Sequence, residues 1–284
     1  LLAPIACGFV GQAFGINYAF VLSTIGMLSG VFVFMLGQKH LKGFNRKPRF
    51  DNDAHKLCGI KPKTFIYLVI ALMVPLVLLI LTENIDGYLL AITAVIVAVY
   101  LAVLYSRQTK KDRQKMQLIF LSIAAVIVFE AFLGQGGTTL NLFIKRLVDR
   151  HFAGLHIPTA AFYSLDPIFM LLIGPFLAGL WMRLSRKKRE PIVTTKYAIA
   201  LFLLGLGFLV FVKAASVAAL QGSASPLYVV LAYCLFPIGE LCIIPISLSL
   251  VTKMAPKGLD SLLVGVWMLS NAASSVFTGW ISML

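Results

Sequence analysis

The chain has 284 residues, of which 60% are hydrophobic and only 13% are charged, and its mean hydropathy is +0.92. This composition excludes a soluble globular protein and is typical of a multi-pass helical membrane protein. The formal net charge is +14, but the basic residues gather in connections between apolar segments, so we expect membrane lipid and no nucleic acid as a partner. The sequence has no GxSxG, P-loop, HExxH or paired-cysteine spacing, so it predicts no enzyme, no metal site and no cofactor.

Nine apolar segments follow one another along the chain, and a helix needs roughly 20 residues to cross the hydrocarbon of a bilayer. They cover residues 1–14, 18–37, 64–81, 88–105, 116–143, 160–184, 195–215, 226–257 and 261–284. The chain starts without Met, and both its ends lie inside apolar runs. We therefore expect a fragment of a longer protein, completed by the missing helices of the same chain.

The connections between these segments alternate in charge. Residues 38–63, 106–115 and 183–196 are strongly basic and 253–260 weakly so, whereas 15–17, 82–87 and 216–225 contain no Lys or Arg. Only 144–159 is of mixed charge. The positive-inside rule predicts that the basic connections are cytoplasmic, in the inner membrane of the cell.

Glu240 lies near the middle of the segment 226–257, between Pro237 and Pro245. A charge at that depth costs about 2.5–3.5 kcal/mol on insertion scales, so an ionisable group there needs a reason. Each proline removes an intrahelical hydrogen bond, and a polar, bent helix in lipid faces protein or a water-filled cavity. This helix is predicted to belong to a transport pathway.

Several segments together resemble the proton-dependent oligopeptide transporters, a branch of the major facilitator superfamily. The run ELCIIPISLSLVTKMAP (240–256) resembles the tenth-helix signature, in which a Glu precedes Ser-Pro and the helix ends in VTKLAP. The run FEAFLGQGGTTLNLFIKRLVDR (129–150) is similar to the seventh helix, and FYSLDPIFMLLIGPFLAGLW (162–181) to the eighth. Residues 3–34 resemble the fifth and sixth helices, and 265–279 the eleventh.

The resemblance implies an all-α, polytopic major facilitator fold of which this chain is a part. Residues 1–37 would end the N-terminal bundle as helices 5 and 6, and 38–115 would be a cytoplasmic linker with two inserted helices. Residues 116–284 would be helices 7–11 of the C-terminal bundle. The implied function is proton-coupled uptake of di- and tripeptides or peptide-like solutes by alternating access. Two alternatives stay open, namely a superfamily transporter of drugs or other small solutes and a membrane sensor or scaffold without coupling.

The resemblance also implies that Glu240 binds the α-amino group of a peptide and takes part in proton coupling. The alternative is a structural charge that a neighbouring helix satisfies. Ile244 occupies the place of a family serine, so one polar contact of the family pattern is lost.

Glu130 is the second candidate for proton coupling. On a continuous helix Glu130, Gly134, Thr138 and Asn141 would share one polar face, which makes Asn141 a candidate substrate ligand. The family's proton-exchanging acid, implied to pair with an arginine of the first helix, corresponds to Gly134. We hypothesise that Glu130, one turn earlier, replaces it; the alternative is a buried Glu bonded to another helix. The patch GQGG (134–137) predicts close packing or a hinge.

Three further residues are candidate substrate ligands. Asp166 stands where the family has an Asn that contacts the peptide amine, although Asp before Pro167 is also a natural N-cap. Trp267 and Ser270 lie in GVWMLS, similar to the family's GxWFLA, where Trp267 would form a wall for a substrate side chain or simply pack. Tyr163 is expected in the interfacial aromatic belt.

Overall fold

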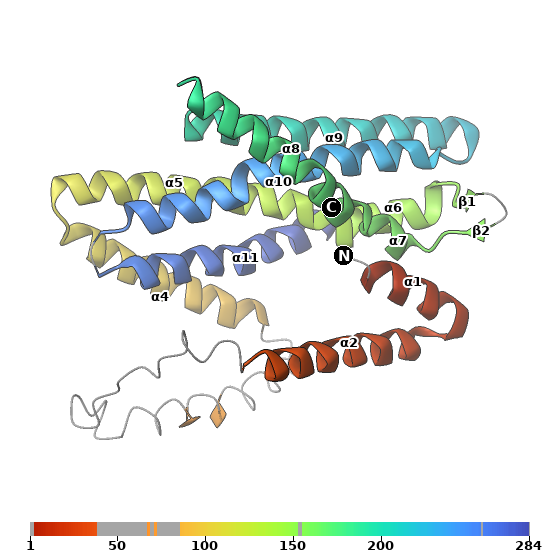
Figure 1. The fold of residues 1–284 in the computed structure, drawn as a ribbon, viewed down its shortest axis with the longest axis horizontal. Coiled ribbons are helices and arrows are strands. Elements are labelled where there is room, and N and C mark those ends of the chain that lie inside the picture. Colours follow the sequence, from red (N-terminus) through yellow and green to blue (C-terminus); the bar gives the residue numbers. More distant parts are fainter. Residues whose placement is uncertain are drawn as a thin grey trace. The chain divides into compact units, whose positions relative to one another are not determined.

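The computed structural model describes residues 3–38, 67–68, 71–72, 86–152, 155–256 and 258–283. These residues are nearly all helical (Figure 1), which confirms the predicted all-α fold. The described residues form two compact units, Leu1–Ser23 with Ala102–Leu284 and, separately, Thr24–Leu101. All the candidate site residues lie in the first unit. The predicted division at residues 37 and 115 stays a prediction.

The elements follow in the order α1 (Ala3–Phe14), α2 (Ile16–Gly37), α4 (Asp86–Ser106), α5 (Lys110–Leu133), η1 (Gly134–Gly137), α6 (Thr139–Leu147), β1 (His151–Phe152), β2 (Leu155–His156), α7 (Thr159–Tyr163), α8 (Leu165–Arg186), α9 (Val193–Gln221), α10 (Pro226–Met254) and α11 (Asp260–Met283). The two short strands pair antiparallel, with His151 opposite His156. Six helical segments of the described part are long and apolar enough to cross a membrane. They coincide with the predicted second and fifth to ninth spans. The predicted span 64–81 lies almost wholly outside the described residues.

Helix α9 is longer than the sequence predicts. It has 29 residues and ends at Gly222, whose φ of 84° is left-handed, whereas the sequence predicts a linker from Ser216 onward. Ser216 does not interrupt the helix, and its hydroxyl donates to the Val212 carbonyl within the helix at 3.0 Å. A serine in this position is satisfied without leaving the helix, so the predicted boundary was wrong.

Aromatic side chains fill the core of the larger unit, where α10 lies beside α9 and α11 beside α5 (Figure 1). Phe236 and Tyr233 of α10 are 1% and 2% exposed, and their ring centroids lie 5.7 Å apart. Phe211 of α9 stacks on Phe236 at 6.4 Å. In contrast, many apolar side chains that point outward are exposed, for example Phe176 at 80%. This pattern is expected where lipid rather than water surrounds the helices.

Two predicted spans are interrupted, and the interruptions position the candidate site. The sequence predicts one helix over 116–143, but the chain passes through the 3₁₀ turn η1, and Thr138 adopts φ −117° and ψ −96°. The helical spacing from Glu130 to Asn141 is therefore broken, which corrects the predicted continuous stripe. The span 160–184 is divided at Ser164 between α7 and α8. Ser164, not Asp166, holds the N-cap position of α8, so the predicted capping role of Asp166 was wrong.

Candidate substrate and proton site

Three carboxylates from three helices form one electrostatic cluster, which we call the acidic cluster. Glu130 lies in the last turn of α5, Asp166 in the first turn of α8, and Glu240 at the middle of α10. Each side chain is half-buried, and Asp166 interacts electrostatically with both glutamates, which also interact with each other. Only Asp166 lies next to one of the helix breaks, two residues after Ser164.

The acidic cluster has no counter-charge in the described part of the chain. The salt bridges found there join Lys115 to Asp112 and Lys196 to Glu190, so neither of them reaches the cluster. Asp166 Oδ1 and Glu240 Oε2 are buried and accept no hydrogen bond from a described residue. Buried polar atoms in proteins are almost always paired. Two orphaned carboxyl oxygens at one site therefore indicate a place that a ligand, water or another part of the intact protein fills.

Two tyrosines extend the acidic cluster. Tyr163, at the end of α7, interacts electrostatically with all three carboxylates, and Tyr233 of α10 interacts with Asp166 and Tyr163. The Tyr233 hydroxyl is also buried without a hydrogen-bond partner among the described residues. A Cβ at Gly136 would lie 3.3 Å from both Tyr163 Cε2 and the Tyr233 hydroxyl. A side chain at this position would push against both rings.

A cavity of about 230 Å³ opens beside these tyrosines. It is lined by Gly136, Gly137, Asn141, Ala160 and Tyr163. Asn141 reaches it because α6 restarts after η1, not because a continuous helix carries it there. The structure thus brings Glu130, Asp166, Glu240 and Asn141 into one region, with Tyr163 between the cluster and the cavity.

Gly134, which stands where the resembled family has its acid, lies in a tight seam between α5 and α11. A Cβ there would come within 2.6 Å of Thr278 Oγ1. Thr278 in turn donates to the Ala131 carbonyl at 2.9 Å. The buried Gln135 side chain donates to the Thr278 carbonyl at 3.0 Å. This geometry leaves no room for an acidic side chain at Gly134, so a carboxylate from α5 reaches the site only from Glu130.

Trp267 and Ser270 lie in the packing between helices rather than at the cavity. Trp267 is 6% exposed, and its indole Nε1 donates to the Ser247 hydroxyl of α10. Ser270 is 3% exposed and donates to the Trp267 carbonyl at 2.5 Å. This geometry favours the packing alternative, so neither residue belongs to the proposed site.

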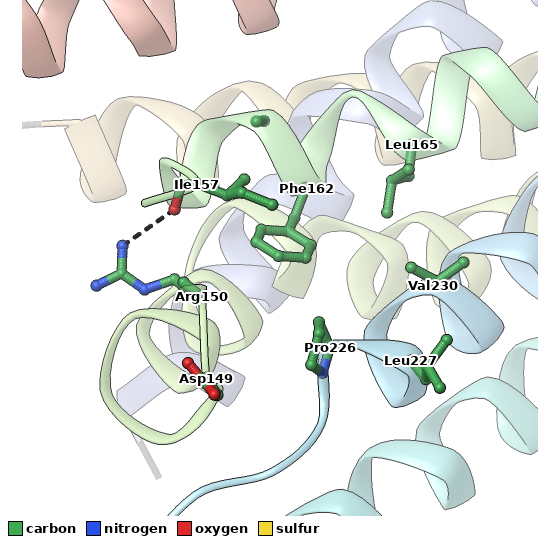
Figure 2. Close-up of a pocket in the computed structure, with 9 residues that line it drawn as sticks. Asp149, Arg150, Ile157, Phe162, Leu165, Pro226, Leu227 and Val230 are labelled. Atoms are coloured by element: carbon green, nitrogen blue, oxygen red, sulfur yellow. Dashed lines mark hydrogen bonds between the residues drawn. The ribbon is translucent and has the colours of Figure 1, made fainter. Parts of the chain in front are cut away.

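A second cavity of about 290 Å³ lies where α7, α8 and the start of α10 meet the 149–157 segment (Figure 2). Its wall is mainly apolar and includes Phe162, Leu165 and Leu227. Figure 2 shows the Arg150 side chain turned to the Ile157 carbonyl, to which it donates at 3.3 Å. None of the predicted site residues lines this cavity, so it is separate from the acidic cluster.

Neither tyrosine of the site is among the site residues predicted from the sequence. The spacing between Tyr233 and Glu240 could have indicated one of them. Tyr163 precedes Asp166 by three residues, and Tyr233 precedes Glu240 by seven. Positions seven apart share a helix face, so Tyr233 lies on the side of Glu240 in α10, whereas the break at Ser164 separates Tyr163 in α7 from Asp166 in α8. The sequence predicts Tyr163 in the interfacial aromatic belt, and for that reason Tyr163 was not a candidate site residue. Among the described residues, no group of three His, Cys, Asp or Glu side chains is arranged to hold a metal ion.

The long apolar helices, with carboxylates along three of them, define a polytopic helical membrane protein. The sequence profile of the POT family matches residues 1–284, and the chain belongs to this family. The chain is 30% identical over 290 residues to the uncharacterized transporter YclF of Bacillus subtilis, covering 99% of this chain and 57% of that protein. It is 27% identical over 295 residues to the peptide transporter YePEPT of Yersinia enterocolitica, covering 99% and 58%.

Solved structures agree with this assignment. A peptide transporter POT in complex with sulfate has a TM-score of 0.81 at 27% identity, covering 99% of this chain and 58% of that one. A mutant of peptide transporter POT in complex with alafosfalin has a TM-score of 0.78 at 28% identity, covering 99% and 57%. The chain thus spans somewhat more than half the length of the relatives it matches.

Proposed function

We propose that the intact protein is a secondary active transporter that takes up di- and tripeptides, or peptide-like solutes, together with protons. Membership of the POT family supports this proposal, as does the similarity to a peptide transporter of Yersinia enterocolitica and to a transporter that binds alafosfalin. The observation that carries it is the pair of buried carboxyl oxygens on Asp166 and Glu240 that accept no hydrogen bond from a described residue.

In this proposal the substrate amine pairs with Glu240. An ammonium group has three donors, and a carboxylate away from bulk water accepts them strongly. Asp166 interacts electrostatically with Glu240, and Asn141 offers both a donor and an acceptor at the wall of the nearby cavity. Alternating access would then expose this site to each side of the membrane in turn, as two helix bundles rock around it.

Proton coupling is assigned to the acidic cluster, with Glu130 in the role that the resembled family gives to an acid at the place of Gly134. Carboxylates that interact cannot all be ionised at low cost, so a proton entering one of them changes how strongly the others hold a cation. Protonation then biases the equilibrium between inward- and outward-open states. The coupling ion is the proton, and the proposal needs no other cofactor.

The inner membrane and the cytoplasmic position of the basic connections are also part of the proposal. Their support is the alternation of basic and uncharged connections in the sequence. The outward-facing apolar side chains of the helices, such as Phe176, would contact lipid.

The assignment of Glu240 is tested by Glu240→Gln in the intact protein, with binding measured by competition against a labelled dipeptide. A hydrogen bond to a charged group contributes about 1.5–3 kcal/mol, so the dissociation constant should rise roughly tenfold to hundredfold. Asp260→Asn is the control, since Asp260 is exposed in the first turn of α11. Unchanged dipeptide affinity in Glu240→Gln would contradict the assignment.

A further inference from the structure

Helix α10 lacks hydrogen bonds of its own backbone on both sides of Glu240. Pro237 and Pro245 lie inside the helix, one before Glu240 and one after it. A proline has no N–H, so each of them removes one intrahelical hydrogen bond. The position of the Glu240 carboxylate therefore depends on how the neighbouring helices hold α10 before and after this residue.

Beside Glu240, α10 is held by close packing of its backbone. A Cβ at Gly239 would lie 3.0 Å from the Ala200 carbonyl oxygen of α9 and 3.2 Å from the Phe129 ring of α5. This contact sets the distance from α10 to both helices. A glycine has no side chain, however, so the contact does little to fix the rotation of α10 about its own axis.

After Pro245, α10 is held by hydrogen bonds between buried side chains. Ser247 of α10 accepts a hydrogen bond from the indole Nε1 of Trp267 in α11. A second hydrogen bond joins Ser247 to the Tyr197 hydroxyl of α9, which lies 2.5 Å from the Ser122 hydroxyl of α5. We call these four residues the hydroxyl network. Each is at most 9% exposed, so the described helices themselves enclose the network.

The donors and acceptors of the hydroxyl network match one another. An indole N–H can only donate, so the Ser247 oxygen is its acceptor and the Ser247 hydrogen is left to donate to Tyr197. Tyr197 can donate in turn to Ser122, and each hydroxyl between the two ends then both accepts and donates. Hydrogen bonds linked in this way strengthen one another where the dielectric constant is low. The network therefore ties α10 to α5, α9 and α11.

We propose that Ser247 is a positioning residue for Glu240. Ser247 follows Glu240 by seven residues, and positions seven apart share a helix face. The helix is continuous through Pro245, so a rotation that is fixed at Ser247 also sets the direction of the Glu240 carboxylate. Trp267 and Tyr197 act through Ser247. The inference rests on the proposed function, in which Glu240 binds the substrate amine, and adds residues that orient this carboxylate.

The experiment measures competition by alanyl-alanine against a labelled dipeptide in the intact protein, for Ser247→Ala, Glu240→Gln and the double variant. We expect Ser247→Ala to raise the dissociation constant roughly threefold to tenfold, because the carboxylate is no longer aimed at the amine. In the Glu240→Gln background the same change should alter it by less than about twofold, because no carboxylate is left to orient. Ser216→Ala is the control and should bind like wild type, since Ser216 is exposed and bonds within α9.

Two further variants test the bonds of Ser247 separately. Trp267→Phe and Tyr197→Phe each keep an aromatic ring and remove one hydrogen-bonding group. Each should weaken binding by less than Ser247→Ala does, and neither should weaken it further when Ser247 is already Ala. Thermal midpoints in detergent show which variants are folded. If Ser247→Ala does not fold, Trp267→Phe takes its place in the comparison with Glu240→Gln.

The outcomes separate this inference from the proposed function. If Glu240→Gln binds the dipeptide like wild type, the proposed function itself is contradicted. If Glu240→Gln weakens binding but Ser247→Ala and Trp267→Phe do not, Glu240 keeps its role and the positioning inference is overturned. Equal weakening by Ser247→Ala with and without the Glu240 carboxylate would show that Ser247 only stabilises the fold, and would overturn the inference as well.

Discussion

Glu130, Asp166 and Glu240 come from α5, α8 and α10, and each would be costly in a bilayer if it stood alone. Their cost is tolerable only where protein, water or a ligand surrounds them, and the negative charge of each neighbouring carboxylate adds to it. Gly134, by contrast, has no side chain. A Cβ at this position would meet Thr278, so the acid that the resembled family has there does not fit. In the proposed function, Glu130 therefore supplies the carboxylate one helical turn before Gly134.

Glu190 and Lys196 form a second charged feature, near the start of α9. Lys196 Nζ lies 2.6 Å from Glu190 Oε1 and 4.8 Å from the centre of the Trp181 ring. Hydrogen bonds from Lys196 and Ser185, together with the positive charge of Lys196, hold the pKa of the Glu190 carboxyl below its usual range. A lowered pKa stabilises the fold above the unfolded-state value of about 4.3, and this stabilisation is lost as the pH falls through the folded-state value.

We therefore expect Glu190→Gln to lower the thermal midpoint in detergent at pH 7, and the difference from wild type to shrink as the pH falls below about 4. Asp112→Asn is the comparison, because its partner Lys115 is 45% exposed whereas Lys196 is 9% exposed in the side chain. Exposed pairs contribute little, so Asp112→Asn should have the smaller effect. Equal shifts for the two variants, or a shift independent of pH, would show that the Glu190 pair does not stabilise the fold.

At the scale of elements, close approach between helices holds the larger unit together. Without water between the helices, small residues and good packing stabilise their association. Gly207 of α9 faces Phe236 of α10, and a Cβ at Gly207 would lie 2.3 Å from the Phe236 ring. A Cβ at Gly205, two residues earlier in the same helix, would have no described neighbour within 4 Å. The same substitution at Gly207 and at Gly205 therefore compares a crowded position with an open one in the same helix.

Gly207→Ala should destabilise the fold by about 1–3 kcal/mol, because the added methyl group overpacks the contact between α9 and α10. Gly205→Ala should be neutral or stabilise the helix by up to about 1 kcal/mol, because alanine has the higher helix propensity. Unfolding in detergent, followed by circular dichroism, measures both variants. A neutral Gly207→Ala would mean that Gly207 and Phe236 are not in this close contact.

At the scale of the whole molecule, the all-helical fold and most of its spans could be predicted, because long apolar segments and alternating basic connections carry that information locally. The depth of Glu240 and its tenth-helix signature likewise pointed to the site. The breaks at η1 and Ser164 could not be placed from local pattern alone. The Gln135 side chain donates a hydrogen bond to the Thr278 carbonyl, and the two residues lie 143 positions apart in the chain. The local helical periodicity of the sequence does not predict a contact over that separation.

The tyrosines of the site illustrate the same limit. Tyr163 lies near a span end, where an aromatic residue is usually an interfacial anchor, and only the short helix α7 and the turn at Ser164 bring it to the acidic cluster. Trp267 shows the converse, since a residue matched to a motif is buried against Ser247. The helix that contains Trp267 was predicted correctly, whereas the span that contains Tyr163 is divided at Ser164. In both cases the direction of the side chain depends on the neighbouring helices.

In the proposed function, the acidic cluster couples peptide uptake to protons through Glu130. The most direct test of this coupling is uptake of a labelled dipeptide by the intact protein in proteoliposomes, with and without an inward proton gradient, for wild type and Glu130→Gln. Wild type should accumulate peptide only with the gradient, and Glu130→Gln should lose this accumulation but still exchange peptide across the membrane when both sides contain it. Gradient-driven accumulation that is unchanged in Glu130→Gln would contradict the account.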